Sequence, residues 1–240
     1  LPTTPGNWQP TPTANAAATF THYPSVTPFA ITSATQFAPN PPPALSSAQY
    51  AADLNEVKEM GSFNSATRTT DQTLVARLWA NVGTPTNFLL VWNNVARTVS
   101  LAQEISTVER ARLFALTNIS LHDALQTTFA SKFQHGMWRP ITAIRHADED
   151  GNAATSPDPA WSSLVPTPPY PSYAGNMSAI GTSQSTILAL FFGRDDIRFD
   201  HTWAGAGGAT CSYAGFGAMA DEQARARVYG GIHAMRTDRS

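Results

Sequence analysis

Four side chains in the second half of the sequence have the types and spacing of an oxyanion site. Lys132 and Arg139 are seven residues apart, and Arg139 directly precedes a proline. Arg227 and His233 are six residues apart, with two glycines between them. A guanidinium pairs bidentately with a tetrahedral oxyanion, and a lysine acts as a mobile point charge. Three such cations could neutralise phosphate or vanadate, and a neutral histidine could attack phosphorus or ligate a metal oxyanion. Solvated or salt-bridged helix ends have the same spacing, so spacing alone names no enzyme.

Two longer elements that contain these residues resemble those of a known superfamily. Residues 132–140, KFQHGMWRP, fit the K-x6-R-P element of the vanadium-dependent haloperoxidases and type 2 phosphatidic acid phosphatases. Residues 226–233, ARVYGGIH, resemble the S-R-x3-G-x-H element of the same superfamily. Residues 138–145 and 167–171 look like its bacterial haloperoxidase-related branch. The resemblance covers most of residues 46 to 235.

The resemblance implies a mostly helical bundle with a buried anion pocket. In this superfamily a lysine, two arginines and backbone amides bind vanadate or phosphate, which assigns these roles to Lys132, Arg139 and Arg227. The last histidine is the covalent ligand of vanadium or the phosphorylated nucleophile, a role that falls on His233. The implied cofactor is vanadate, with phosphate in the same pocket or no cofactor as alternatives. The implied partners are small molecules, namely peroxide and a halide that is oxidised with the metal acting as a Lewis acid.

The middle element of the superfamily, P-S-G-H, departs from its pattern in this chain. An ungapped match places Gly175 and Asn176 where a serine and a glycine line the anion, and Met177 where a histidine serves as general acid/base. A thioether carries no proton, and loss of a general acid/base commonly removes about 10²- to 10⁴-fold of rate. A one-residue gap would place Asn176 in the histidine position, but an amide is no acid/base either. Ala226 replaces a serine, and His135 is a candidate substitute proton carrier.

Three functions therefore stay open. The first is a haloperoxidase-like protein that binds vanadate or phosphate and, if active, oxidises halides with peroxide. The second is a catalytically degenerate structural or assembly protein on the same fold. The third is an acid phosphatase, which would turn over phosphate esters without peroxide.

The elements that must position these residues are predicted to be helices. Residues 1–45 are rich in proline, which forbids continuous helix and favours an extended arm before a helical domain at 46–240. Capping-box patterns at Ser46/Gln49 and Ser106/Glu109 mark two helix starts. Clear strand alternation is absent, so the fold class is all-α, a helical bundle with a Pro-rich loop at 148–171 and a Gly-rich loop at 205–217. The predicted helices cover residues 46–61, 71–82, 86–105, 106–131, 138–147, 178–192 and 218–234.

The helix predicted at 106–131 has the clearest pattern in the chain. Its apolar residues recur at three- and four-residue spacing, as a core-facing stripe requires. The predicted stripe consists of Val108, Ala111, Phe114, Ala115, Ile119, Leu125 and Phe129.

Composition excludes several other classes. With 15 basic and 17 acidic residues the formal net charge is -2, which gives no electrostatic footprint for nucleic acid or an anionic membrane. No run of 18 apolar residues is present, so no obvious transmembrane helix is predicted. The single cysteine, Cys211, excludes an internal disulfide and a thiolate zinc site.

Two further expectations concern localisation and assembly. The low lysine content and the high content of Ala, Thr, Ser and Pro favour a secreted or periplasmic protein. The superfamily resemblance implies further helices on both sides of this domain, so we expect either a fragment of a longer protein or an oligomer or bundle completed by another chain.

Overall fold

The computed structural model describes residues 3–80, 88–203 and 208–234 and is mostly helical, which confirms the predicted helical bundle. None of its described helices combines the length and hydropathy that a membrane span requires. The helices are α1 (Ala48–Met60), α2 (Thr70–Ala80), α3 (Val91–Ala102), α4 (Thr107–His135), α5 (Pro140–Arg145), α6 (Asn176–Phe192) and α7 (Phe216–Tyr229). Short 3-10 turns are η1 (Tyr23–Ser25), η2 (Phe88–Leu90) and η3 (Ala147–Glu149), and the strands are β1 (Phe199–Trp203) and β2 (Ala209–Tyr213).

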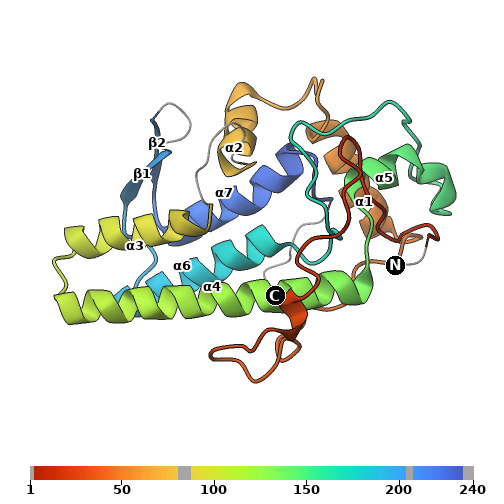
Figure 1. Cartoon of the computed structure of the whole chain (residues 1–240). Coiled ribbons are helices and arrows are strands. Elements are labelled where there is room, and N and C mark those ends of the chain that lie inside the picture. The colour runs from red at the N-terminus through yellow and green to blue at the C-terminus, as the bar shows by residue number, and fades with distance from the viewer. Residues whose placement is uncertain (1–2, 81–87, 204–207, 235–240) are drawn as a thin grey trace.

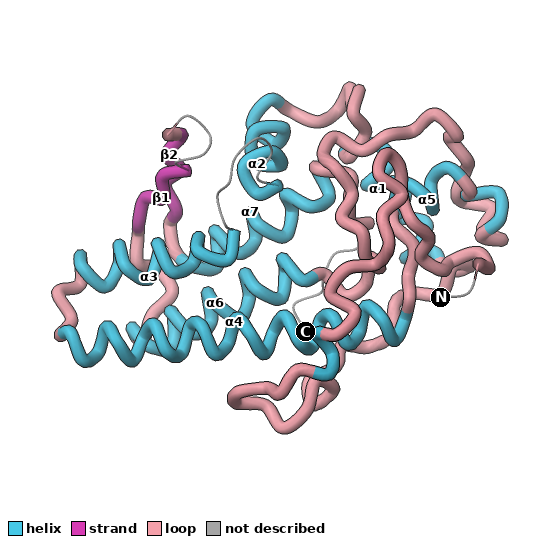
Figure 2. Tube along the Cα trace, viewed as in Figure 1, coloured by secondary structure: helices cyan, strands magenta, loops and turns pink. Residues whose placement is uncertain are grey.

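The long helix α4 and the helix α6 form the centre of the bundle. α6 packs between α4 and α7, α3 packs on α4, and α2 packs on the other side of α7 (Figure 1). A large buried cluster joins these helices to the hairpin, and a smaller one lies around α1 and α5. Most of the loops gather at the α1–α5 end, away from the hairpin (Figure 2). The carboxyl ends of α4 and α7 and the start of α6 therefore meet near the loops.

Local sequence signals account for both ends of α4. The hydroxyl of Ser106 accepts the N–H of Glu109, and the Glu109 carboxylate accepts the N–H of Ser106 at 2.9 Å, so the predicted capping box is confirmed. At the other end Gly136 has a φ of 59°, a left-handed conformation that favours glycine and ends the helix after His135. The helix is thus one turn longer than predicted, and Lys132 lies inside its last turn.

The buried face of α4 differs from the predicted stripe. The predicted stripe residues that are exposed instead are Val108, Ala111 and Ala115. The buried row runs through Leu113, Thr117 and Leu121 before it reaches Leu125 and Phe129, which are buried as predicted. Thr117 is compatible with burial because its hydroxyl donates to the Leu113 carbonyl at 3.0 Å. The prediction counted apolar residues only. It therefore missed this row, which contains a threonine whose hydroxyl is hydrogen-bonded within the helix.

The structure adds one short hairpin, which the sequence analysis did not predict, to the all-α bundle. β1 and β2 form an antiparallel hairpin in which Phe199 is paired with Tyr213 and His201 with Cys211. Residues of β1 alternate between buried and exposed, but only over five positions, one of them the buried His201. An alternation this short and partly polar falls below what a pattern search detects. Residues 204–207 of the predicted Gly-rich loop lie outside the described residues.

Several predicted helix boundaries also shift. The hydroxyl of Ser47, not of Ser46, caps α1, because it accepts the Tyr50 N–H at 3.2 Å. α7 ends at Tyr229, five residues early, because a turn with Gly231 at a φ of 76° follows it. The predictions for residues 81–82 and 86–87 fall outside the described residues.

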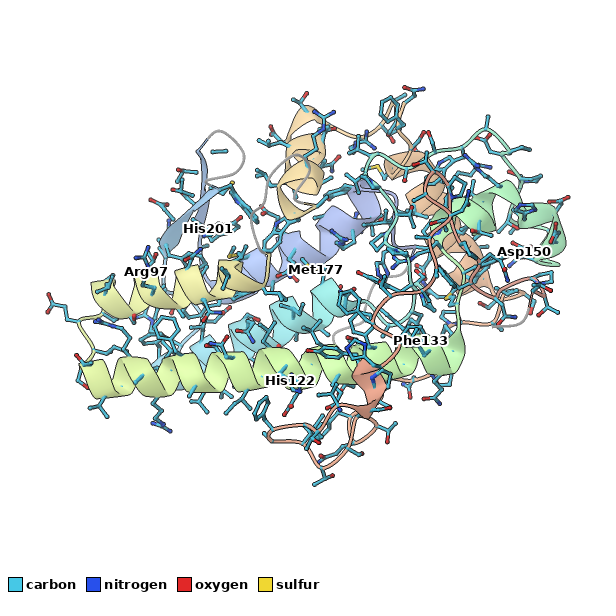
Figure 3. The ribbon with its side chains drawn as sticks, in the orientation of Figure 1. Arg97, His122, Phe133, Asp150, Met177 and His201 are labelled. Atoms are coloured by element: carbon cyan, nitrogen blue, oxygen red, sulfur yellow. The ribbon has the colours of Figure 1, made fainter. Side chains whose placement is uncertain are left out.

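One carboxylate of α4 binds three backbone N–H groups of the N-terminal arm. Asp123 Oδ1 accepts the N–H of Phe29 at 2.9 Å, and Oδ2 accepts those of Ala30 at 2.8 Å and Ile31 at 3.1 Å. The neighbouring ring of His122 faces the same arm and packs on the Phe29 ring (Figure 3). Burial raises the pKa of Asp123, but the three N–H groups and His122 outweigh it, so the pKa is lowered. One side chain therefore satisfies three backbone donors of the arm.

Replacing this carboxylate should loosen the arm. Asp123→Ala is expected to lower the free energy of unfolding by about 3 kcal/mol, because hydrogen bonds to charged groups contribute ~1.5–3 kcal/mol each and are not additive. Urea denaturation followed by circular dichroism measures the change. Asp123→Asn keeps one acceptor oxygen, so its free energy of unfolding should lie between those of the parent chain and of Asp123→Ala. An unchanged denaturation midpoint in Asp123→Ala would contradict the assignment.

Candidate anion site

The structure brings the four predicted site residues together at the ends of three helices. Lys132 lies in the last turn of α4, Arg139 is the N-cap of α5, and Arg227 lies in the last turn of α7. His233 follows the turn after α7. Lys132 is 0% exposed, Arg139 1% and His233 7%. Lys132 and Arg139 both lie on the Tyr170 ring. Arg139 donates to the Ile232 carbonyl and the Arg227 carbonyl accepts the Ile232 N–H, directly before His233, so the four residues form one cluster.

Backbone carbonyls hold the Lys132 amine in place. Its Nζ donates to the carbonyls of Pro171 at 3.0 Å and Ser172 at 2.8 Å. The same nitrogen lies 5.2 Å from the centre of the Tyr170 ring. Because an ammonium has three N–H groups, one remains beyond these two carbonyl contacts.

Carbonyls also orient the two arginines. Arg139 donates from Nε to the Tyr170 carbonyl at 2.7 Å and from Nη1 to the Ile232 carbonyl at 2.8 Å. Its Cζ lies 4.9 Å from the centre of the Tyr170 ring. Arg227 donates from Nη1 to the carbonyl of Trp79 at 3.1 Å. Each guanidinium is thus fixed on one side by main-chain acceptors.

On their other side these groups have no partner. Arg139 Nη2, Arg227 Nε and His233 Nε2 are buried and make no hydrogen bond. Over residues 3–80, 88–203 and 208–234, the ion pairs involve other side chains, and no carboxylate neutralises this cluster. A buried polar atom without a partner costs about 1–3 kcal/mol, so native proteins keep such atoms mainly where something satisfies them. Two donors and one ring nitrogen among three cations fit a tetrahedral oxyanion.

The electrostatics of the cluster keep His233 neutral. Burial, followed by the charges of Lys132, Arg139 and Arg227, holds the pKa of His233 well below 6.5. Burial also lowers the pKa of Lys132 well below 10.5, with further lowering from Arg139 and Arg227. Burial and the charge of Arg227 bring the pKa of Arg139 to about 10, although Tyr170 opposes this. At neutral pH the ring of His233 therefore has one nitrogen with a free lone pair.

The lowered pKa of Lys132 predicts how stability changes with pH. In the unfolded chain Lys132 binds its proton more tightly than in the folded one, so the free energy of unfolding should rise with pH between the lowered folded pKa and 10.5. The measurement is urea denaturation at pH 7, 8 and 9 in buffer free of phosphate and vanadate. Lys132→Met should remove this part of the slope, because it removes the titrating group. An identical slope in both proteins would contradict the prediction.

Gly175 and Asn176 lie where α6 begins. Gly175 is the N-cap of α6, Asn176 is its first residue, and both are buried. No side chain caps this turn, and the first N–H groups of any helix have no partner within it. The carbonyl of Ser172, three residues before Gly175, is one of the two that accept from Lys132. The start of α6 therefore adds free N–H groups and a partial positive charge beside the cluster.

Met177 and His135 contact different elements around the cluster. Met177 is 3% exposed and lies between α6 and α7, where Gln223 Nε2 approaches its sulfur at 3.9 Å (Figure 3). Gln223 lies one helical turn before Arg227 on α7. His135 instead packs on the Tyr173 ring at 5.7 Å, and the charges that act on His233 do not include it. Met177 thus contacts the helix that carries Arg227, whereas His135 contacts the loop whose Ser172 carbonyl accepts from Lys132.

A close backbone approach fixes the turn that carries His233. Gly231 has a φ of 76°, and a Cβ on it would lie 2.3 Å from the Gly61 carbonyl oxygen. A Cβ on Gly61 would likewise lie 2.4 Å from the Gly231 Cα. Only glycine fits at either position, so the end of α1 sets the path of the chain into His233.

Sequence reasoning missed the groups that orient the cations. These are the carbonyls of Tyr170, Pro171, Ser172, Ile232 and Trp79 and the Tyr170 ring. Tyr170 belongs to the TPPYP segment that resembles the superfamily, which was its only signal. Main-chain acceptors leave no signal, because any residue type supplies a carbonyl.

The described residues contain no group of three His, Cys, Asp or Glu side chains that could hold a metal ion. A metal bound as an oxyanion needs no such group, because oxygens fill its coordination shell and a single histidine can complete it. The donors present suit a bound oxyanion rather than a bare cation.

Comparisons with known proteins identify the family and the fold of this chain. The family model described as the VCPO second helical-bundle domain matches residues 112–240. The vanadium chloroperoxidase of Curvularia inaequalis is 25% identical over 192 residues, which is 67% of this chain and 30% of that protein. The crystal structure of a bacterial vanadium-dependent iodoperoxidase matches with a TM-score of 0.83 and 30% identity over 97% of this chain and 56% of that one.

A second solved structure, an apo-type bacterial vanadium-dependent chloroperoxidase, shares the fold with a TM-score of 0.74 and 17% identity over 97% of this chain and 58% of that one. The chain thus spans between about a third and just over half of the length of these relatives. Because the family model matches more than half of its residues, the chain belongs to the vanadium haloperoxidase superfamily and contains its second helical-bundle domain.

Proposed function

We propose that the chain binds vanadate in the cluster of Lys132, Arg139, Arg227 and His233 and supports peroxide-dependent oxidation of halide ions. The observation that carries this proposal is a set of three buried atoms without a partner, Arg139 Nη2, Arg227 Nε and His233 Nε2. In the described part of the chain, no ion pair brings a carboxylate to this cluster. The solved iodoperoxidase and chloroperoxidases that the chain resembles are vanadium-dependent, which supports the choice of anion. Phosphate, which has the same tetrahedral shape, should compete for the cluster.

Each residue has a distinct task in this proposal. Arg139 and Arg227 donate their free N–H groups to oxygens of the anion, and Lys132 adds charge and its remaining N–H group. His233, kept neutral by its lowered pKa, offers its free ring nitrogen as the ligand. Bound vanadate supplies a Lewis-acidic centre that activates peroxide without changing its own oxidation state. The carbonyls around Lys132 and Arg139 keep these donors from rotating away.

A second candidate is an anion-binding protein without rapid turnover. Met177 favours it, because a buried thioether occupies the position that resemblance assigns to the general acid/base histidine. An acid phosphatase would use the same pocket, and no contact among the described residues favours it over the other two functions.

The test is a titration of the purified chain with orthovanadate followed by ⁵¹V NMR, with phosphate as competitor. Peroxide and bromide or iodide are then added with monochlorodimedone, and p-nitrophenyl phosphate is tested without peroxide. We expect saturable binding, competition by phosphate, and halogenation that needs both vanadate and peroxide. Binding without halogenation supports the second candidate, and ester hydrolysis without peroxide supports a phosphatase. Absence of binding overturns the proposal.

A further inference from the structure

Arg68, in the loop between α1 and α2, contacts three backbone carbonyls. Its Nη1 donates to the carbonyls of Met60 at 2.6 Å and Ser62 at 2.7 Å and, over a longer distance of 3.4 Å, to that of Tyr229. Its Nε donates to the Thr73 hydroxyl at 3.0 Å, which sets the orientation of the planar guanidinium. The side chain therefore joins its own loop to a residue 161 positions later in the chain.

Two of these carbonyls belong to the ends of helices. Met60 is the last residue of α1 and Tyr229 is the last residue of α7, and the two helices pack together (Figure 1). The last carbonyls of a helix have no partner within it, and together they carry a partial negative charge. A guanidinium between two such ends donates to both and brings a positive charge to both. No ion pair in the described part of the chain joins Arg68 to a carboxylate, so the two helix ends are the partners of its charge.

The carbonyls that accept from Arg68 flank a close backbone contact. Gly61 lies between the first two of them, and a Cβ on it would lie 2.4 Å from the Gly231 Cα. Gly231 in turn lies two residues after Tyr229 and two before His233. A contact this close exists only while the two helix ends keep their separation. Arg68 binds the chain on both sides of Gly61 and at the end of α7, so it holds that separation.

We propose that Arg68 is a positioning residue of the anion site, because it holds the end of α7 against the end of α1 and thereby keeps His233 in the cluster. This inference rests on the proposed function, since it concerns the histidine that would ligate vanadium. The hydrogen bonds of the Arg68 side chain go to carbonyls and to the Thr73 hydroxyl. Arg68 therefore acts through the backbone and not on the anion.

The binding test measures orthovanadate and phosphate affinities by equilibrium dialysis. Arg68→Met removes the donors but keeps a long unbranched side chain. It should weaken vanadate binding at least about tenfold, because loss of a group that orients a metal ligand costs ~10- to 100-fold in metal affinity. Phosphate binding should change much less, because Lys132 and Arg227 are held by carbonyls outside the turn that carries His233.

Two further variants make this test specific. Arg68→Lys keeps a charge and donors for the carbonyls but loses the planar fork, so it should recover part of the vanadate affinity. Arg77→Met removes an exposed arginine of α2 and should bind both anions as the parent chain does. Thermal melts check that each variant is folded.

The outcomes separate this inference from the proposed function. Unchanged vanadate affinity in Arg68→Met overturns the inference, while the proposed function stands. Equal losses for vanadate and phosphate also overturn it, because Arg68 would then support the whole site and not the histidine. If the parent chain binds no vanadate, the proposed function fails, and the role of Arg68 in it fails as well.

A measurement without any anion checks the same inference. The N–H groups of Gly231 and Ile232 donate to the carbonyls of Val228 and Arg227, so their hydrogen exchange reports on the turn before His233. In Arg68→Met, mass spectrometry should show faster exchange in residues 230–233 and 61–63 and the parent rate in residues 136–143. Exchange that is unchanged in residues 230–233, or equally faster in all three segments, overturns the inference.

Discussion

His233→Ala is expected to weaken orthovanadate binding by about a hundredfold or more, equal to ~2.7 kcal/mol, and phosphate binding by much less. His233 Nε2 is buried, has no partner and belongs to a ring whose pKa is held well below 6.5, so it is free to ligate a metal. Phosphate binding depends mainly on the cations, which this variant keeps. A selective loss for vanadate is therefore the signature of ligation by the ring.

Two further variants make the comparison specific. Arg139→Met should weaken both anions alike, by about 10- to 100-fold, because it removes a buried charge-assisted donor worth ~1.5–3 kcal/mol. His146→Ala removes an exposed histidine that is paired with Glu149 and should leave both affinities unchanged. Equilibrium dialysis against orthovanadate and against phosphate gives the dissociation constants. Equal losses for the two anions in His233→Ala would show that the ring acts only by its bulk or polarity.

Met177→His is expected to raise the kcat of halide oxidation by about 10²-fold or more, the range over which general acid/base groups act. The side chain at 177 is buried in the first turn of α6 and contacts Gln223, one turn before Arg227 on α7. A histidine there would place a titratable nitrogen near the arginine end of the anion site, where methionine has none. The gain should appear with its own pH dependence, since only one protonation state donates a proton.

Met177→Gln is the matched control, because an amide is polar and close in length but carries no transferable proton. Iodide oxidation at pH 5 to 8, with saturating vanadate and peroxide, compares the three proteins. Thermal melts show whether a polar group at this buried position destabilises the fold. If Met177→His binds vanadate as tightly as the parent chain but gains no rate over Met177→Gln, the missing histidine is not what limits turnover.

Much of the helical framework follows from local sequence. The start of α4 is set by a reciprocal pair three residues apart, Ser106 and Glu109, and its end by the left-handed Gly136. Each signal involves groups within one helical turn, where the chain itself keeps the partners close. The short motifs that contain Lys132, Arg139, Arg227 and His233 are local as well, and their resemblance to two elements of the superfamily predicted an anion site.

What the sequence alone did not determine depends on partners far apart along the chain. The carboxylate of Asp123 binds N–H groups 92 to 94 residues away, and Arg139 donates to a carbonyl 93 residues away. The buried row on α4 likewise depends on distant segments that pack against it. Backbone carbonyls and amides are the same at every position, so the residue type does not predict which of them will bind a side chain. Only the tertiary structure decides which backbone groups meet a given side chain, because it brings distant segments together.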